Sequence, residues 1–214
     1  MQFSLYTSYY LHFSLFVITV YFIIFYFVVY IYTDDSSVLQ YSTNEIETFL
    51  SHGKRVHVLK APNSSEKTKV LARLVRDMNR VVEWCVLYKY PNEQDSIRLK
   101  HNWLKLDIHE TTFKDHVAYV VDKNKDFKLC VTTPNGEHEN ENTMRFVVLH
   151  EMAHMMSSSY GHNIEFNNHF INLLRVAVHL NVYTPEMSSL NPVTYCGTTV
   201  SSSPCESVSC NVLE

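Results

Sequence analysis

The chain has 214 residues, enough for one or two domains, and its 22 acidic and 18 basic side chains give a formal net charge of −4 at pH 7. The Lys and Arg residues form no dense basic stripe, which argues against a dedicated nucleic-acid surface and against a nucleic-acid partner. The five cysteines include no Cys-x-x-Cys pair, so a zinc ribbon is not predicted.

The first segment with a clear character is the apolar run FSLFVITVYFIIFYFVVYIY at residues 13–32, which carries no charge. A helix of this length covers about 30 Å, the thickness of a hydrocarbon core. A cleaved signal peptide is the alternative, but no basic residue precedes the run and no small-residue cleavage site follows it. We therefore expect a single-pass membrane anchor at 1–32 with the lipid bilayer as its partner, in an orientation that Lys and Arg do not fix.

The rest of the chain divides into three parts. Residues 33–44 are polar and small, as is typical of a linker. Residues 45–198 have the patterns of a folded domain, and residues 199–214 form a tail with serine and cysteine. Three of the five cysteines lie near this end: Cys196, Cys205 and Cys210. A disulfide among them would need an oxidising compartment.

The first half of the domain is predicted to open with a strand and a long helix. The strand lies in KRVHVLKAP, where polar and apolar residues alternate. The helix follows from Asn63 to Pro91, and Glu66 stands three residues after Asn63, the spacing of a capping box. Residues 92–116 have a mixed pattern that predicts no single element.

The second half begins with two β-rich runs at 117–122 and 127–132 around the polar turn DKNKD, which predict an antiparallel hairpin. The segment NTMRFVVLHEMAHMMSSS then predicts a helix capped by Asn142 or Thr143. Gly161 is expected to stop it, because glycine readily takes the left-handed conformation that ends helices.

A last helix is predicted in HNIEFNNHFINLLRVAVHL at residues 162–180. Its apolar residues recur at helical spacing and would form a buried stripe: Phe166, Phe170, Leu173, Leu174, Ala177 and Leu180. The predicted fold class is therefore α+β, with an N-terminal transmembrane helix followed by a small domain of helices and antiparallel strands.

The helix before Gly161 carries the motif HEMAH at residues 150–154. His150 and His154 are four residues apart, so both imidazoles project from one face and suit two corners of a tetrahedral metal site. Glu151 lies about 100° around the helix, where it can reach a metal-bound water as a general base. The alternative is a pair of core histidines bonded to backbone carbonyls. The apolar flanks of the motif suggest that the helix is buried, where a histidine pair without partners would be costly.

A catalytic zinc needs a third protein ligand and one open position. His162 is the preferred candidate, because Gly161 turns the chain and brings it back toward the motif. Glu165 is the rival, as a carboxylate ligand from the following helix. It could instead cap that helix or orient a ligand by a hydrogen bond.

The other polar groups of this region have simpler interpretations. The remaining histidines lack ligand spacing to the motif and are expected in the core or on the surface. Tyr160 and Tyr195 could donate to an oxyanion, but a packing or surface role is favoured.

At these residues the chain resembles a zincin metallopeptidase of the SprT-like or WLM type. In that type, His-Glu-x-x-His is followed by Gly-His-x-x-x-Phe at the opening of the next helix. The second segment here is GHNIEF, so the resemblance gives His162 the role of third ligand. More widely, residues 117–198 resemble uncharacterised metallopeptidase-like proteins of large DNA viruses. The resemblance implies zinc-dependent hydrolysis, whereas the acidic balance and the missing zinc ribbon do not favour DNA repair.

Together these features predict a membrane-anchored zinc metallopeptidase whose substrate is a protein or peptide. Zn²⁺ would be held by His150, His154 and His162, and a zinc-bound water activated by Glu151 would attack the peptide bond. The strand at 127–132 would line the cleft and pair with an extended substrate. The alternative is a catalytically inactive, membrane-tethered binding or structural protein with a structural zinc site.

Overall fold

The computed structural model describes residues 20, 40–42, 46–111, 118–121, 126–133, 135–186, 191–211 and 213, with only the backbone described at 40–42, 118–121 and 126. The chain divides into two compact units, Met1–Val38 and Leu39–Glu214. The second unit extends beyond the expected domain at both ends, so part of the expected linker and the tail belong to it.

The predicted transmembrane helix is not supported. Among the helices in the described part of the chain, none combines the length and apolar composition that a membrane crossing requires. Residues 13–32, on which the prediction rested, lie outside the described residues except for Val20. A lipid bilayer and a protein interior both accept an uncharged apolar segment. The apolar composition of residues 13–32 therefore did not establish by itself that they cross a membrane. The predicted membrane anchor, bilayer partner and single-pass membrane localisation are corrected accordingly.

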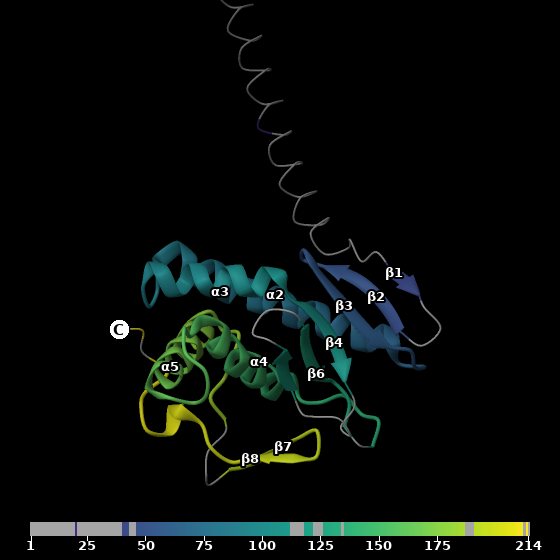
Figure 1. Cartoon of the computed structure of the whole chain (residues 1–214). Coiled ribbons are helices and arrows are strands. Elements are labelled where there is room, and N and C mark those ends of the chain that lie inside the picture. Colours follow the sequence, from purple (N-terminus) through teal and green to yellow (C-terminus); the bar gives the residue numbers. More distant parts are fainter. Residues whose placement is uncertain are drawn as a thin grey trace, which may run out of the picture. The chain divides into compact units, whose positions relative to one another are not determined.

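A six-stranded mixed sheet forms one side of the Leu39–Glu214 unit (Figure 1). In sheet order its strands are β1 (Gln40–Ser42), β2 (Ile46–Ser51), β3 (Lys54–Leu59), β4 (Asp107–Thr111), β6 (Asp126–Cys130) and β5 (Ala118–Val121). Strands β3, β4 and β6 are parallel, whereas β1 and β3 flank β2 in antiparallel pairs.

Strands β5 and β6 form the antiparallel hairpin that the sequence predicted. However, β6 is hydrogen-bonded to β4 on one side and to β5 on the other. The expectation that the strand at 127–132 pairs with a substrate is therefore wrong, because both of its edges are already occupied. Among the described strands, β5 lies at this end of the sheet.

Four helices cover the sheet on one side (Figure 1): α2 (Ser64–Tyr88), α3 (Glu93–Lys105), α4 (Glu141–Met156) and α5 (Ile164–His179). Helix α2 contacts β2 and β3 as well as the other three helices, and so connects the sheet to α4 and α5. Helix α3 and strand β4 lie within the stretch 92–116, for which the sequence pattern predicted no single element. The described helices and mixed sheet agree with the predicted α+β class.

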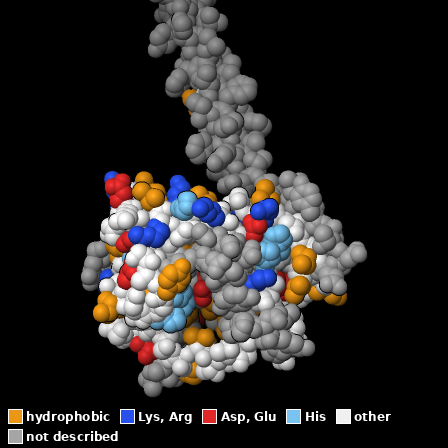
Figure 2. Space-filling view, viewed as in Figure 1, with side chains coloured by type: hydrophobic (Ala, Val, Ile, Leu, Met, Phe, Trp, Pro, Cys, Tyr) orange, Lys and Arg blue, Asp and Glu red, His pale blue; other side chains and the backbone are white. Residues whose placement is uncertain are grey.

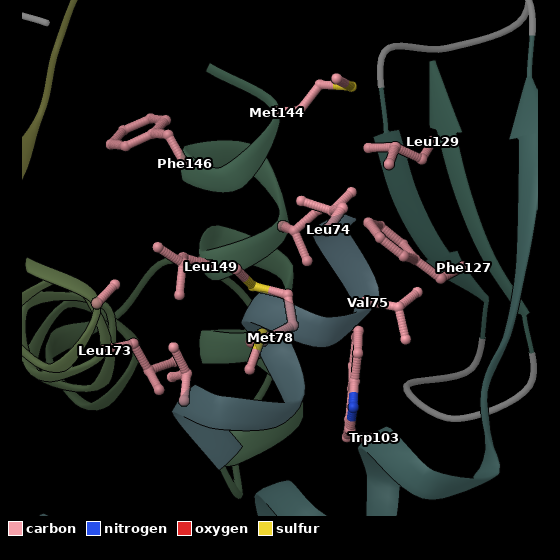
Figure 3. Packing of buried hydrophobic residues seen from close by; sticks show 14 of the residues in the cluster. Leu74, Val75, Met78, Trp103, Phe127, Leu129, Met144, Phe146, Leu149 and Leu173 are labelled. Atoms are coloured by element: carbon pink, nitrogen blue, oxygen red, sulfur yellow. The ribbon is translucent and has the colours of Figure 1, made fainter. Parts of the chain in front are cut away.

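The core lies between the sheet and the helices (Figure 3). Leu74 and Met78 of α2 lie between Phe127 of β6 and Leu149 of α4, and all four side chains are buried. Full burial of one such side chain contributes about 1.5–3 kcal/mol. Helix α4 is therefore held against α2 by buried apolar contacts, and the ion pair of Arg145 with Asp77 of α2 adds to them.

The start of α2 differs from the predicted capping box. The Asn63 side chain makes no capping hydrogen bond. Instead, the Ser64 hydroxyl oxygen accepts a hydrogen bond from the backbone N–H of Ala61 at 2.7 Å and donates to its carbonyl. Glu66 pairs with Lys69 within the first turn rather than reaching back to Asn63. The helix start was correctly placed, but a different side chain stabilises it.

Two disulfides join parts of the C-terminal region to each other and to the sheet. Cys130, at the end of β6, is bonded to Cys196, and Cys205 is bonded to Cys210. Cys196 lies in the turn between β7 (Val193–Tyr195) and β8 (Thr198–Val200). The first disulfide therefore ties this small hairpin to the sheet, and the second closes a loop around the short helix η1 (Pro204–Glu206).

We expect Cys85 to be the free thiol of the chain and to be unreactive while the chain is folded. It is buried in α2, and this burial raises its pKa to about 12, so very little nucleophilic thiolate is present at neutral pH. Alkylation followed by mass spectrometry should label no cysteine in the native chain and Cys85 alone after unfolding without reductant. Labelling at Cys196 or Cys205 in the unreduced chain would contradict the two disulfides.

Candidate metal centre

Helix α4, which carries the HEMAH motif, begins one to two residues before the predicted cap. The Asn140 side chain accepts a hydrogen bond from the backbone N–H of Thr143 at 3.0 Å and so caps the helix. The amide of Asn142, one of the predicted caps, instead bonds to the backbone N–H and carbonyl of Thr184 at 3.0 and 2.8 Å. This contact fastens the segment after α5 to the first turn of α4.

The end of α4 also differs from the prediction. The helix ends at Met156, and a loop at 157–163 leads to α5. Gly161 has a φ of +81° within this loop, in the left-handed region that favours glycine, and turns the chain toward α5. His162 therefore lies in the loop, whereas the sequence placed it at the start of a helix that in fact begins at Ile164.

The imidazoles of His150, His154 and His162 converge on one point. The Nε2 atom of His162 lies 3.1 Å from the Nε2 atom of His154 and 3.1 Å from the Nε2 atom of His150. One ring nitrogen of each residue lies within 4.8 Å of the others. Nitrogens that share a tetrahedral zinc at about 2.0–2.1 Å are about 3.3 Å apart. The spacing of the three rings therefore fits a single ion of this size.

Hydrogen bonds among the rings account for this geometry less well than a cation does. In a neutral imidazole, Nε2 carries either one hydrogen or one lone pair. The Nε2 atom of His162 can therefore satisfy one of its two close contacts by a linear hydrogen bond, but not both. A cation between the rings would accept a lone pair from each nitrogen at once. The donor set of three imidazoles suits zinc, copper, iron or nickel, with zinc the usual occupant of a three-histidine site.

The aromatic ring of Phe166, in the first turn of α5, forms the floor of the histidine cluster. Its centroid lies 4.2 Å from that of His154, 4.7 Å from that of His162 and 4.9 Å from that of His150. Phe166 is only 2% exposed. Because this ring contacts all three imidazoles, its position sets their mutual orientation and keeps one side of the site dry.

Burial keeps His150 in the neutral form that a metal ligand requires. Desolvation, followed by the neighbouring His154 and His162, lowers the pKa of His150 to about 4. Its imidazole therefore stays uncharged at neutral pH. His162 by contrast is exposed, so the cluster is accessible from one side. Histidine side chains reach the surface on the face shown in Figure 2, among acidic and basic groups of both signs.

Glu165, the rival third ligand, is engaged elsewhere. Its carboxylate accepts hydrogen bonds from the backbone N–H groups of Ser158 and Ser159 at 2.7 and 3.0 Å, and from both hydroxyls. These bonds, chiefly those from Ser159, lower the pKa of Glu165 to about 2. Glu165 thus braces the loop that carries His162, and its oxygens are not part of the histidine cluster.

The remaining predicted site residues fall in different places. Glu151 follows His150 on α4 and is partly exposed, next to the cluster in the chain. Tyr195 is buried and its hydroxyl donates to the carbonyl of Cys130 at 2.6 Å, so it is not available to an oxyanion. Tyr160 is 79% exposed in the loop after α4.

Two features of the site were not recognised in the sequence. Phe166 was assigned to a buried stripe, but not to the floor of the histidine cluster. His169, three residues later, was given a core or surface role; it is buried and bonds to both Asp95 and Ser157. Spacing on α5 could have suggested that these two side chains share a face, but not what they contact.

Comparison with known proteins finds a distant relative in a virus. The chain is 31% identical over 112 residues to "Uncharacterized protein R325" of Acanthamoeba polyphaga mimivirus, an alignment that covers 51% of this chain and 55% of the relative. The chain thus spans little more than half the length of this relative. No protein-family model matches the chain, and no solved structure matches it. The expected likeness to proteins of large DNA viruses is confirmed at this level, whereas membership of the SprT-like or WLM type is not shown.

Proposed function

We propose that this chain is a zinc-dependent metallopeptidase, with His150, His154 and His162 as ligands and Glu151 as general base. The observation that carries the proposal is the convergence of three imidazole nitrogens, two of them 3.1 Å from the third. Two of these rings come from one helical face and the third from a separate loop. A chance cluster of core histidines would not need both elements to aim their rings at one point.

The chemistry follows from the residues around this point. A zinc ion held by three neutral imidazoles supplies Lewis acidity, which polarises a carbonyl and makes water more acidic. Glu151 would accept a proton from the attacking water and pass it to the departing amine. Glu151 follows His150 on α4, about 100° around the helix, from where its carboxylate could reach a water beside the ligands without being one of them. The exposure of His162 leaves one side open for a substrate.

The sheet offers a place for an extended peptide. Strand β5 lies at one end of the strand order and contacts α4, the helix with the histidine pair. An extended chain that adds to such an edge forms main-chain hydrogen bonds that do not depend on its side chains. We therefore propose that the substrate is a peptide segment in extended form, bound along β5 rather than along β6.

The test measures metal content and peptide cleavage on the same full-length sample. Purified chain should contain about one zinc per molecule by elemental analysis, and should cleave members of an unstructured peptide library. Removal of zinc with a chelator should abolish cleavage, and stoichiometric zinc should restore it. Bound zinc with no cleavage of any peptide would instead favour a purely structural zinc site. Absence of bound zinc after reconstitution would reject the metal centre itself.

A further inference from the structure

The C-terminal end of α4 is held by side chains from α3. Arg98 donates a hydrogen bond from Nη1 to the carbonyl of Met156 at 2.6 Å, and Asn102 donates from Nδ2 to the carbonyl of Met155 at 2.8 Å. The last carbonyls of a helix have no partner within the helix. These two bonds therefore satisfy the end of α4 and fix its position relative to α3.

A second set of bonds joins the same end to α5. The Ser157 hydroxyl donates to the carbonyl of Ala153 at 2.8 Å and lies 3.0 Å from Nδ1 of His169. The other ring nitrogen of His169 lies 3.1 Å from a carboxylate oxygen of Asp95 in α3. Ser157 is 1% exposed and His169 is 5% exposed. Asp95, His169 and Ser157 thus form a largely buried chain of hydrogen bonds that joins α3, α5 and the C-cap residue of α4.

The direction of these bonds follows from the carboxylate. Burial alone would raise the pKa of Asp95, but hydrogen bonds from Asn92, His169 and Arg98 leave it below its usual value. Asp95 is therefore ionised at neutral pH and accepts only. His169 must present its Nε2–H to Asp95, which leaves a lone pair on Nδ1 facing the Ser157 hydroxyl, so the single hydrogen of that hydroxyl is shared between Nδ1 and the Ala153 carbonyl.

The arrangement of a serine, a histidine and an aspartate invites comparison with a nucleophilic triad, and the structure argues against that role. A nucleophile must be reachable by a substrate carbonyl. The Ser157 hydroxyl is buried, and it is occupied by the Ala153 carbonyl and by His169. The chain of hydrogen bonds therefore holds the helices rather than carrying out chemistry.

This chain of bonds lies directly beneath the candidate metal centre. Ser157 is three residues after His154 and directly follows the last residue of α4, and His169 is about one helical turn after Phe166 on α5. Phe166 in turn contacts the rings of His154 and His162 at 4.2 and 4.7 Å between centroids. The contact between Ser157 and His169 thus fixes the distance between His154 of the motif and His162 of the loop.

We propose that His169, oriented by Asp95, is a positioning residue for the metal centre: it locks α5 to the end of α4 and so holds His162 at ligand distance from His154. The inference rests on the proposed zinc site. Groups that hydrogen-bond directly to a metal ligand typically affect metal affinity by about 10- to 100-fold. His169 is one contact further away, because its partners are Ser157 and Asp95, so we expect about the lower end of that range when the lock is broken, without any change of ligand.

The experiment compares two Asp→Asn variants of the full-length chain. Asp95→Asn weakens the lock but keeps the size of the side chain. Asp77→Asn is the matched control, because Asp77 of α2 accepts hydrogen bonds from Arg145 of α4 at 2.8 and 3.0 Å and so holds the opposite half of the same helix. His169→Phe removes both bonds of the histidine while keeping a planar ring.

Two quantities are measured in each variant: the zinc affinity, by chelator competition, and the visible spectrum of the Co²⁺-loaded chain. Asp95→Asn and His169→Phe should weaken zinc binding by about tenfold and shift the Co²⁺ bands, whereas Asp77→Asn should lower the melting temperature and leave both unchanged. Wild-type affinity and an unshifted spectrum in Asp95→Asn would overturn the inference. Equal changes in Asp77→Asn would also overturn it, because a general loss of stability would then explain them.

A metal-free measurement separates this inference from the proposed function. In the apo chain, the imidazole NMR signals of His154 and His162 should move in Asp95→Asn and stay in place in Asp77→Asn. If the wild-type chain fails to bind zinc, the proposed function fails, yet these signals still decide whether the lock positions the two rings. If the signals are the same in both variants and in the wild type, the lock has no such role.

Discussion

Glu151→Gln is expected to bind zinc as the wild-type chain does and to lose about 10²- to 10⁴-fold in the rate of peptide cleavage, the usual contribution of a general base. The amide has the size of the carboxylate but cannot take a proton from water. The three ligand nitrogens are untouched, so metal content should not change. Steady-state cleavage of one peptide identified in the library, together with zinc analysis, measures both quantities.

Glu141→Gln is the matched control for this variant. Glu141 lies on the first turn of the same helix and pairs with Arg73 and Arg145. Its replacement weakens two partly exposed ion pairs, which contribute about 0–1 kcal/mol each, and should leave the cleavage rate close to that of the wild type. Full activity in Glu151→Gln would exclude Glu151 as the base, and equal losses in both variants would point to a disturbed helix.

His154→Ala is expected to abolish stoichiometric zinc binding. The change removes one of three ligands and the ring that stacks on Phe166 at 4.2 Å between centroids. The loss of affinity should exceed the roughly 10- to 100-fold that follows when a ligand merely loses its hydrogen-bond partner. A ligand that binds only the folded state raises the melting temperature, so added zinc should stabilise the wild-type chain and leave the variant unchanged.

His179→Ala serves as the control for that experiment. His179 is an exposed histidine at the end of α5, and its ring lies 5.8 Å from the Trp84 ring, away from the cluster. This variant should keep its zinc and its zinc-dependent rise in melting temperature. Undiminished zinc in His154→Ala would mean that the three converging rings do not hold the ion.

The sequence predicted those features that depend only on residues close together in the chain, such as helical spacing and strand alternation. The four-residue spacing of His150 and His154 placed both on one face of a helix, and alternation around a polar turn located the hairpin of β5 and β6. Helix α3 also had local signals that were overlooked: Asn92 caps it, acidic residues lie in its first turn and Lys105 lies in its last.

Strand β4 shows why some elements could not be read in this way. Its sequence DIHET is mostly polar, yet it lies inside the sheet between β3 and β6. Glu110 is tolerated there because its carboxylate accepts a hydrogen bond from Lys67 of α2 at 2.6 Å and another from the backbone N–H of Leu59 at 2.8 Å. Partners so distant in the sequence leave no trace in a local pattern.

The sequence by itself determined that His150 and His154 share one face of a helix and that Glu151 follows the first of them, because helical periodicity is a property of the local backbone. Only the tertiary structure showed that His162, and not Glu165, lies with the two motif histidines. The direction of the loop at 157–163 depends on where Phe166 packs and on how Ser158 and Ser159 bond to Glu165, and these contacts exist only once α4 and α5 have met. The placement of α5 against the end of α4 depends in turn on Asp95 and His169, which lie 74 residues apart in sequence.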